Sequence, residues 1–339
     1  MYSYDIMKLL LLQRWNEMKK IWCLLLSLTM AITVGCKDKA IYKETNIQEE
    51  ESVVVNDNEI KQVEIATEIE KINDKDLVEL IDEKVNEITG EYKDNVSIYF
   101  RNLNTNEEYT LNEDIYYVAA STNKIPLSMI ILDDVNNGNK SLNDMIYFIE
   151  ADREGGSGVL YYMDEIPPLT ISEAINLAIV ESDNIAKNML IRASSIGITD
   201  YMRSITNDDS IPYGNYTTAK QLGILLNNLY ENQDNNPNYK MLIDYMTKTS
   251  FHDRLDKYID YDKVAHKIGT YYRYYHDAGI IYGKDPYILV VLTKDIGELS
   301  DEPYNNEGED ERFVLDWGEE ACEIIAQISK EIYNLVETN

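Results

Sequence analysis

Three short motifs in this sequence contain residue types that could carry out acyl transfer. In the first, Ser121-x-x-Lys124, the two side chains share one face of a helix predicted to begin at about residue 122. The serine hydroxyl can lose its proton to the lysine if burial and neighbouring positive charge lower the pKa of Lys124. Taken alone, this motif favours a serine that caps the helix and a solvated lysine.

The second motif, Ser182-Asp183-Asn184, interrupts an apolar stretch that is predicted to be helical over residues 170–192. Polar residues on an apolar face need buried partners or a cavity. A hydroxyl there can relay protons, and an amide can orient both a lysine and a substrate carbonyl. The alternative interpretation is a polar kink in the helix.

The third motif runs from His266 to Thr270 on a predicted strand. Lys267 supplies positive charge for a substrate carboxylate, and Gly269 permits a substrate backbone to approach the strand edge. The backbone amide of Thr270, together with that of Ser121, could form an oxyanion hole. Taken alone, the motif favours an ordinary edge strand with a solvated lysine.

The elements that must position these motifs are predicted from hydrophobic periodicity and turn residues. Helices are predicted over residues 77–88, 122–135, 170–192, 217–230, 238–248 and 312–336. Strands are predicted over residues 96–101, 109–111, 264–270, 277–282 and 287–292. This order predicts an α+β fold, in which an antiparallel sheet has helices on its faces.

Composition narrows the classes of function. The 339 residues carry 31 Lys and Arg against 61 Asp and Glu, a net charge of −30, which argues against binding nucleic acid by bulk charge. Residues 75–339 hold 22 basic and 48 acidic groups, so the acidity belongs to the body of the chain. The three cysteines fit neither a disulfide framework nor a zinc site, and with three histidines we expect no metal and no cofactor.

Residues 1–36 are predicted to be an export signal. A basic pair, Lys19-Lys20, precedes an apolar run and Gly35-Cys36. The junction resembles a bacterial lipoprotein signal, which implies that Cys36 is lipidated and that the body is held outside the cytoplasm at the membrane. An uncleaved anchor is the alternative. Residues 37–74 are predicted to be an acidic flexible tether, and residues 75–339 a catalytic domain.

Together, in this order and spacing, the three motifs resemble those of the class A serine β-lactamases and their penicillin-binding relatives. The resemblance spans residues 75–337. It implies an α/β sandwich with a five-stranded antiparallel sheet flanked by helices, plus an all-helical subdomain, with the active site between the two. It also implies a monomer that needs no cofactor.

The resemblance also implies a role for each motif residue. Ser121 is the nucleophile, Lys124 is its base or proton relay, and Ser182 passes a proton to the leaving nitrogen. The implied substrate-binding residues are Asn184, Lys267, Gly269 and Thr270.

One part of the family pattern is missing. Class A β-lactamases activate the deacylating water with a glutamate on a loop after the Ser-Asp-Asn helix, but this chain has no glutamate from Ser182 to Tyr230. Asp208 or Asp209 could substitute, although a surface turn is the favoured role. Without a positioned base, water attack loses roughly 10²–10⁴-fold of rate. A second departure is Ile268, where the family has a hydroxyl residue that contacts the substrate carboxylate; Thr270 could supply that contact instead.

These observations leave three hypotheses. The first is a serine acyl-hydrolase that opens β-lactam rings, or cleaves related D-alanyl amides, through an acyl-Ser121 intermediate. The second is a DD-peptidase or slow penicillin-binding protein acting on peptidoglycan stems. The third is a non-catalytic wall-binding or sensor lipoprotein. The missing glutamate counts against the first hypothesis, and the complete set of acylating residues counts against the third.

Overall fold

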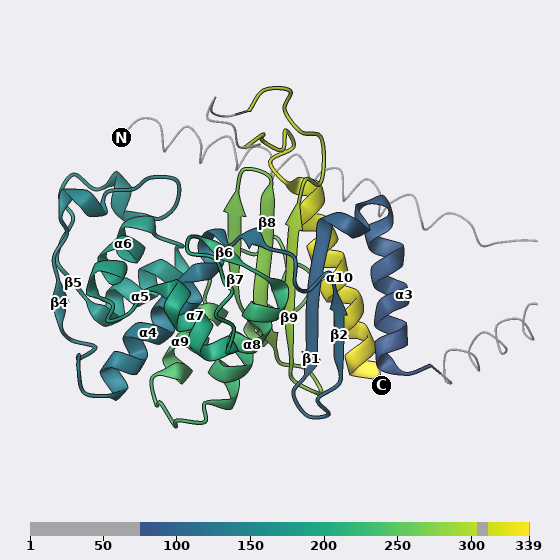
Figure 1. Ribbon diagram of the computed structural model, residues 1–339, viewed down its shortest axis with the longest axis horizontal. Helices are drawn as coiled ribbons and strands as arrows, with labels where there is room; N and C mark the ends of the chain where they lie inside the picture. The colour runs from purple at the N-terminus through teal and green to yellow at the C-terminus, as the bar shows by residue number, and fades with distance from the viewer. Residues whose placement is uncertain (1–74, 304–310, 339) are drawn as a thin grey trace, which may run out of the picture. The chain divides into compact units, whose positions relative to one another are not determined.

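A five-stranded antiparallel sheet organises the part of the chain that the computed structural model describes, residues 75–303 and 311–338 (Figure 1). Its strands are β1 (Val96–Asn102), β2 (Glu108–Leu111), β7 (Val264–Tyr271), β8 (Tyr274–Ile281) and β9 (Tyr287–Lys294). Their order across the sheet is β2-β1-β9-β8-β7. The export signal, Cys36 and the tether predicted for residues 1–74 lie outside the described residues.

The central strand β9 shows why this sheet is buried on both faces. Its side chains alternate between two apolar cores, because successive residues of a strand point to opposite faces. Ile288, Val290 and Leu292 lie in one core, and Leu289 and Val291 lie in the other. A continuous apolar run of this kind is typical of a strand that is covered on both sides.

Helices cover both faces of the sheet. One face packs against α3 (Leu77–Thr89) and α10 (Glu319–Thr338), and the other packs against α8 (Ala219–Glu231) (Figure 1). The remaining α-helices form the helical part of the molecule: α4 (Lys124–Asn136), α5 (Ile171–Val180), α6 (Asn184–Ala193), α7 (Ile198–Thr206) and α9 (Tyr239–Thr247).

Short elements connect these larger ones. The two-residue strands are β3 (Tyr117–Val118), β4 (Met145–Ile146), β5 (Leu169–Thr170) and β6 (Tyr216–Thr217). The 3-10 helices are η1 (Gly90–Asn95), η2 (Ala120–Asn123), η3 (Glu150–Asp152), η4 (Leu160–Tyr162) and η5 (Tyr261–Lys263). Across residues 75–303 and 311–338, no helix combines the length and the apolar character that a bilayer crossing requires.

The predicted fold class is confirmed, since an antiparallel five-stranded sheet is flanked by helices and accompanied by a helical part. The predicted single helix over residues 170–192 is wrong. Two helices, α5 and α6, occupy this range and are separated at Ser182, whose φ is +52°. Asp183 explains the break, because its carboxylate accepts from the Ala186 amide at 2.9 Å and caps α6.

The structure differs from the sequence prediction at one helix boundary and in one additional helix. The last helix begins at Glu319 and not at residue 312, because Asp316 accepts from the amides of Gly318 and Glu320 and because Trp317 has φ +57°. Helix α7 was not predicted at all. Its apolar residues Ile198, Tyr201, Met202 and Ile205 have the i, i+3, i+4, i+7 spacing of a helix and pack against the helical core, so the sequence pattern did indicate this short helix.

Candidate active site

Ser121 lies on η2, the 3-10 turn that leads directly into α4. The sheet holds this segment through His276, whose Nε2 lies 2.9 Å from the carbonyl oxygen of Val118. Burial lowers the pKa of His276 to about 4, so the imidazole is neutral and donates that bond. Ala120, directly before Ser121, has φ +49°. Strained backbone of this kind persists where the surrounding structure enforces it, often at functional sites.

Lys124 follows one turn later and is 1% exposed. Its Nζ lies 3.0 Å from Ser121 Oγ and 2.8 Å from Asn184 Oδ1. The same nitrogen lies 2.6 Å from the carbonyl oxygen of Ser182 and 3.1 Å from Ser182 Oγ. The amine is therefore fixed between the two serine hydroxyls.

The surroundings of Lys124 favour its neutral form. Burial and the positive charges of Lys267 and Lys187 lower the pKa of Lys124 to about 6, against the opposing charges of Asp183 and Glu154. An amine with this pKa is mostly unprotonated at neutral pH. Its lone pair can then accept a proton from the neighbouring serine hydroxyl.

Ser182 lies between two lysines at the break that separates α5 from α6. Its Oγ is 3.1 Å from Lys124 Nζ and 3.0 Å from Lys267 Nζ. The side chain is 2% exposed, and the left-handed backbone at this residue directs it toward both amines. A proton can pass between Lys124 and Ser182 with no rearrangement of the chain.

Lys267 comes from β7 and is fully buried. Burial lowers its pKa to about 7, with Asp277 acting to raise the pKa and Arg254 acting to lower it. Its Nζ also lies 5.5 Å from the ring centre of Phe251 and donates to the carbonyl oxygen of Ile268 at 3.2 Å. The positive charge that would attract a substrate carboxylate is therefore present below about pH 7.

The other two residues of the second motif are held differently. Asn184 accepts from Lys124 through Oδ1 and donates through Nδ2 to the Gly155 carbonyl oxygen at 2.8 Å. The bonds of Asp183 go to backbone. Besides capping α6, its carboxylate accepts from the amide of Val159 at 2.7 Å, which ties the 155–160 loop to the motif.

Gly269 allows β7 to lie against the nucleophile turn. A Cβ at this position would lie 2.9 Å from the carbonyl oxygen of Ala119 and 3.1 Å from Thr122 Cγ2. The sequence predicted that this glycine admits a substrate backbone. In the structure, the close neighbour is the chain's own η2 turn, so any side chain here would displace Ser121.

Arg254 is a residue of this site that the sequence analysis missed. Its Nη1 donates to the carbonyl oxygens of Gly269 at 2.9 Å and His276 at 2.7 Å, and its Nη2 donates to Thr270 Oγ1 at 2.7 Å. The guanidinium is 3% exposed, and the hydroxyl it holds belongs to an exposed residue at the end of β7. Arg254 lies in a polar loop without a motif, so no spacing in the sequence points to it.

The opposite side of the nucleophile turn is formed by the segment that follows α7. Strand β6 pairs with β3 and brings the end of this segment beside η2. The Ala119 amide donates to the Asn215 carbonyl oxygen at 2.9 Å, and Asn123 Nδ2 donates to Asn215 Oδ1 at 2.8 Å. The side chain that this segment places against the nucleophile turn is thus the amide of Asn215. The carboxylate of Asp208 instead accepts hydrogen bonds from the amide and the hydroxyl of Ser210 within a turn.

A carboxylate does act on Lys124, but it comes from another loop. Glu154 accepts from Lys187 Nζ at 2.9 Å and from Asn188 Nδ2 at 2.7 Å. Burial raises the pKa of Glu154, but these two partners lower it by more, so the net shift is downward. A carboxylate that is paired in this way is a weak base.

The structure therefore brings together Ser121, Lys124, Ser182, Asn184 and Lys267, and it places Gly269 against the nucleophile turn. Their catalytic and substrate-binding roles remain predictions. The arrangement provides a nucleophile, a neutral amine beside it, a hydroxyl that can relay a proton, and a cation for an anionic substrate.

Comparison with known proteins identifies the family of the chain. The model of the beta-lactamase enzyme family matches residues 80–336. A curated relative, beta-lactamase VEB-1 of Pseudomonas aeruginosa, is 25% identical over 225 residues, which cover 58% of this chain and 71% of that protein.

Solved structures show the same fold. PBP-A is 20% identical and has a TM-score of 0.63, with 77% of this chain and 97% of that chain covered. A class A beta-lactamase from Bacteroides cellulosilyticus is 19% identical and has a TM-score of 0.65, with coverage of 78% and 100%. A variant of PBP-A has been solved as an acyl-enzyme complex with penicillin G. At these identities, the likeness establishes the fold.

Proposed function

The chain belongs to the beta-lactamase enzyme family, and on that premise we propose that it is a serine hydrolase that opens β-lactam rings, or cleaves related D-alanyl amides, through an acyl-Ser121 intermediate that it releases slowly. The observation that carries the proposal is the buried contact of Lys124 Nζ with Ser121 Oγ at 3.0 Å and Ser182 Oγ at 3.1 Å.

In the first step, neutral Lys124 takes the proton of Ser121, and Oγ forms a bond to the substrate carbonyl carbon. The carbonyl π electrons move to oxygen, and the backbone amides of Ser121 and Thr270 stabilise the resulting oxyanion. These donors cost no reorganisation during the reaction, because the turn and the strand already hold them.

In the second step, the tetrahedral intermediate collapses and the carbon–nitrogen bond breaks. Ser182 gives its proton to the leaving nitrogen and receives the proton that Lys124 took from the nucleophile. The contacts of Ser182 Oγ with both lysines provide this path. The products of the step are an acyl-Ser121 ester and a neutral amine, and the net transfer is of one proton from Ser121 to the leaving nitrogen.

The substrate carboxylate would lie at the end of β7. Lys267 supplies positive charge there, and Thr270 offers a hydroxyl that Arg254 holds in place. The sequence predicted that Thr270 replaces the hydroxyl missing at Ile268. Arg254 gives that prediction a structural basis, because its bond to Oγ1 leaves the hydroxyl proton free to be donated to an anion.

A DD-peptidase or slow penicillin-binding protein is the second candidate. It is favoured by one observation: Asn215, and not a carboxylate, has its side chain beside Asn123 on the nucleophile turn. An enzyme without a base for the deacylating water keeps its acyl group longer, by roughly 10²–10⁴-fold. A peptidase can transfer the acyl group to an amine or to water slowly and still function, whereas a β-lactamase must hydrolyse it rapidly.

An intact-mass time course tests the proposal. The full chain is mixed with a penicillin, and both the protein adduct and the opened drug are followed. An adduct that forms and then clears, with many equivalents of opened drug, identifies a working β-lactamase. A persistent adduct identifies the penicillin-binding or peptidase activity. No adduct and no drug consumption would contradict both.

We also propose that the enzyme acts outside the cytoplasm, attached to the membrane by a lipid on Cys36. The support is the sequence signal at Gly35-Cys36 alone. A Cys36→Ser variant should leave the membrane fraction or stay unprocessed. A variant that is processed normally and remains fully membrane-bound would indicate an uncleaved anchor.

A further inference from the structure

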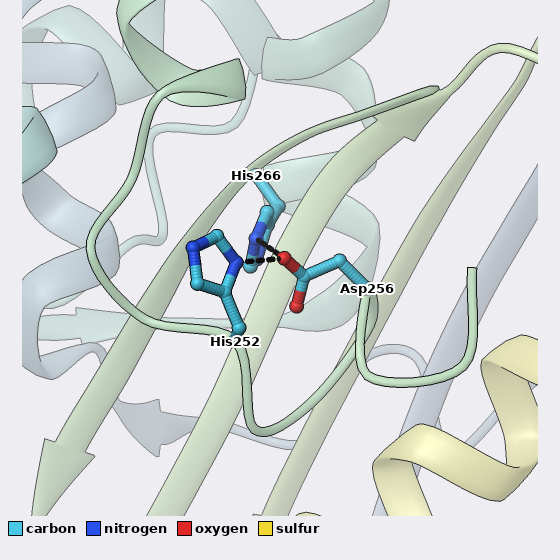
Figure 2. A group of neighbouring side chains, drawn as sticks. All are labelled: His252, Asp256 and His266. Carbon is cyan, nitrogen blue, oxygen red and sulfur yellow. Dashed lines mark hydrogen bonds and ion pairs between the residues drawn. The ribbon is translucent and has the colours of Figure 1, made fainter. Parts of the chain in front are cut away.

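His252 and Asp256, on the loop that follows α9, form a cluster with His266 on β7 (Figure 2). His266 precedes Lys267 on β7, so its side chain points to the opposite face of the sheet from the acylating residues. The neighbouring strand residues agree, since Ala265 lies in the core on the helical side and Val264 in the core that contains α10. The proposed reaction uses none of the three side chains.

The distances in this cluster fit a small cation. His266 Nε2 lies 3.2 Å from Asp256 Oδ2, and His252 Nδ1 lies 2.5 Å from the same oxygen. Two ligand atoms of a tetrahedral zinc ion are roughly 3.3 Å apart. His266 Nε2 and Asp256 Oδ2 already have that spacing. His252 Nδ1 and Asp256 Oδ2 would have to move apart by less than about 1 Å. His252 lies on a loop and its side chain is 33% exposed, so it can make this movement.

Two buried atoms in the cluster lack hydrogen bonds. Among the residues that the structure describes, His266 Nε2 and Asp256 Oδ1 have no hydrogen-bond partner, although their residues are 0% and 1% exposed. The 3.2 Å approach of Nε2 to Oδ2 therefore brings the atoms close without hydrogen-bond geometry. Buried polar atoms without partners are rare in native proteins, and an unplaced ion is one of the few explanations for them.

His266 also has the outer partner that metal-binding histidines require. Its Nδ1 lies 2.8 Å from Asp277 Oδ2 and 3.0 Å from Oδ1. Donation of the Nδ1 proton to this carboxylate leaves Nε2 with a lone pair that points toward Asp256. Asp277 is itself fixed, because the amide of Leu255 donates to its Oδ2 at 3.1 Å.

Charge gives a further reason for a cation. Asp256 and Asp277 are both buried, and a divalent ion would balance their two negative charges. Metal binding uses the neutral imidazole of His266, with the remaining ring proton on Nδ1 facing Asp277.

We propose that His252 Nδ1, Asp256 and His266 Nε2 bind one divalent transition-metal ion, with Asp277 orienting His266. Two imidazoles and one carboxylate suit Zn²⁺. The second oxygen of Asp256, or a water reaching the exposed side of His252, completes the coordination. The ion would link two segments: the loop after α9, which contains Arg254, and strand β7, which contains His266. No pattern in the sequence indicates this site, because its ligands do not have zinc-finger spacing.

Metal binding by the purified full chain tests the proposal directly. The chain is stripped with a chelator, incubated with Zn²⁺, passed through gel filtration and analysed for metal. We expect about one equivalent to be retained. With Zn²⁺ at 100-fold above its Kd, the Tm should rise by roughly 5–10 °C. Co²⁺ in place of Zn²⁺ should give visible absorption bands that report nitrogen and oxygen ligands in a site of low coordination number.

His252→Ala and Asp256→Asn should each abolish retention of the ion and the absorption bands. Asp260→Asn is the matched control, because it removes an exposed carboxylate from the same loop without touching a ligand. If Asp256→Asn fails to fold, His252→Ala decides, since its side chain is partly exposed. Absence of retained metal in the wild type, or equal retention in His252→Ala, would overturn the proposal. These readouts need no substrate, so they stand apart from the test of acylation.

Discussion

The two sides of the nucleophile turn are built in contrasting ways. On one side, Lys124, Ser182 and Lys267 are at most 2% exposed and contact one another through side-chain atoms. On the other side, residues 212–216 are exposed and contact the turn through the backbone and one amide side chain of Asn215.

This contrast shows what burial does for catalysis. Burial lowers the pKa of Lys124 and Lys267 to values near neutral pH. These amines can therefore take up and release protons at physiological pH. The exposed side has no buried acid whose pKa could be raised in the same way. This contrast supports the proposal that the chain forms an acyl-enzyme more readily than it hydrolyses one.

The largest expected effect is on the buried side. Ser121→Ala should abolish covalent labelling by penicillin, because the other hydroxyl that contacts Lys124, that of Ser182, is only 2% exposed. Intact-mass analysis measures this. Ser210→Ala, the same change in the exposed segment, should label as the wild type does. Continued labelling of Ser121→Ala would refute the nucleophile assignment.

The next effect concerns pH. Lys124 must be neutral to accept a proton, and its pKa is lowered to about 6, so the acylation rate should rise as pH increases through 6. Lys267 must be charged to attract a carboxylate, and its pKa is lowered to about 7, so the rate should fall above 7. Stopped-flow measurement of the acylation rate from pH 5 to 9 tests for this bell-shaped pH profile.

Lys124→Met serves as the control for that profile. It should lower the acylation rate by about 10³-fold and remove the rising limb near pH 6, because the general base is gone. An acidic limb that persists in Lys124→Met would mean that another group governs it.

Adding an acid to the exposed side should reduce the contrast. Asn215→Glu places a carboxylate where an amide now contacts Asn123, and the half-life of the penicillin adduct should fall by up to about 10²-fold. Asn215→Gln has the same length without the charge and should leave the half-life unchanged. Equal half-lives in the two variants would show that this position does not reach the water.

A smaller effect is expected at the carboxylate end of the site. Arg254→Lys keeps the charge but cannot donate simultaneously to the Gly269 carbonyl oxygen on β7 and to Thr270 Oγ1, as the guanidinium does. Acylation by penicillin should slow by about 10-fold, and acylation by its carboxylate methyl ester should change much less. An equal loss with both compounds would point to a general distortion of the site.

The smallest effect is expected at Asp209, an exposed residue of the turn after α7. Asp209→Asn should change neither acylation nor adduct lifetime by more than about twofold, because a short exposed side chain is a poor water-activating base. A clear increase in adduct lifetime would show that the exposed side does contain a base.

Sequence reasoning could find the buried side because each motif is local. Ser121 and Lys124 are one helical turn apart, and Ser182 and Asn184 are separated by one residue, so their types and spacing already carry the chemistry. The helix break at Ser182 was not predicted, because an apolar stretch shows its period more clearly than a left-handed residue within it.

The contacts that only tertiary structure creates were beyond prediction. Arg254 and Asp277 lie in segments that look like an ordinary loop and strand, and their partners on β7 become neighbours only when the sheet forms. The meeting of Asn215 with Asn123 depends on the pairing of β3 with β6. Neither pairing leaves a pattern in the sequence on its own.

The bond from the Ala119 amide to the Asn215 carbonyl oxygen joins backbone to backbone. The position of this segment beside the nucleophile therefore does not depend on which side chain residue 215 carries. A substitution at residue 215 can therefore change the chemistry beside Ser121 while the strand pairing that holds the segment persists. Under the proposed function, the rate of deacylation is then a property that one position can tune while the fold and the acylating residues are inherited unchanged.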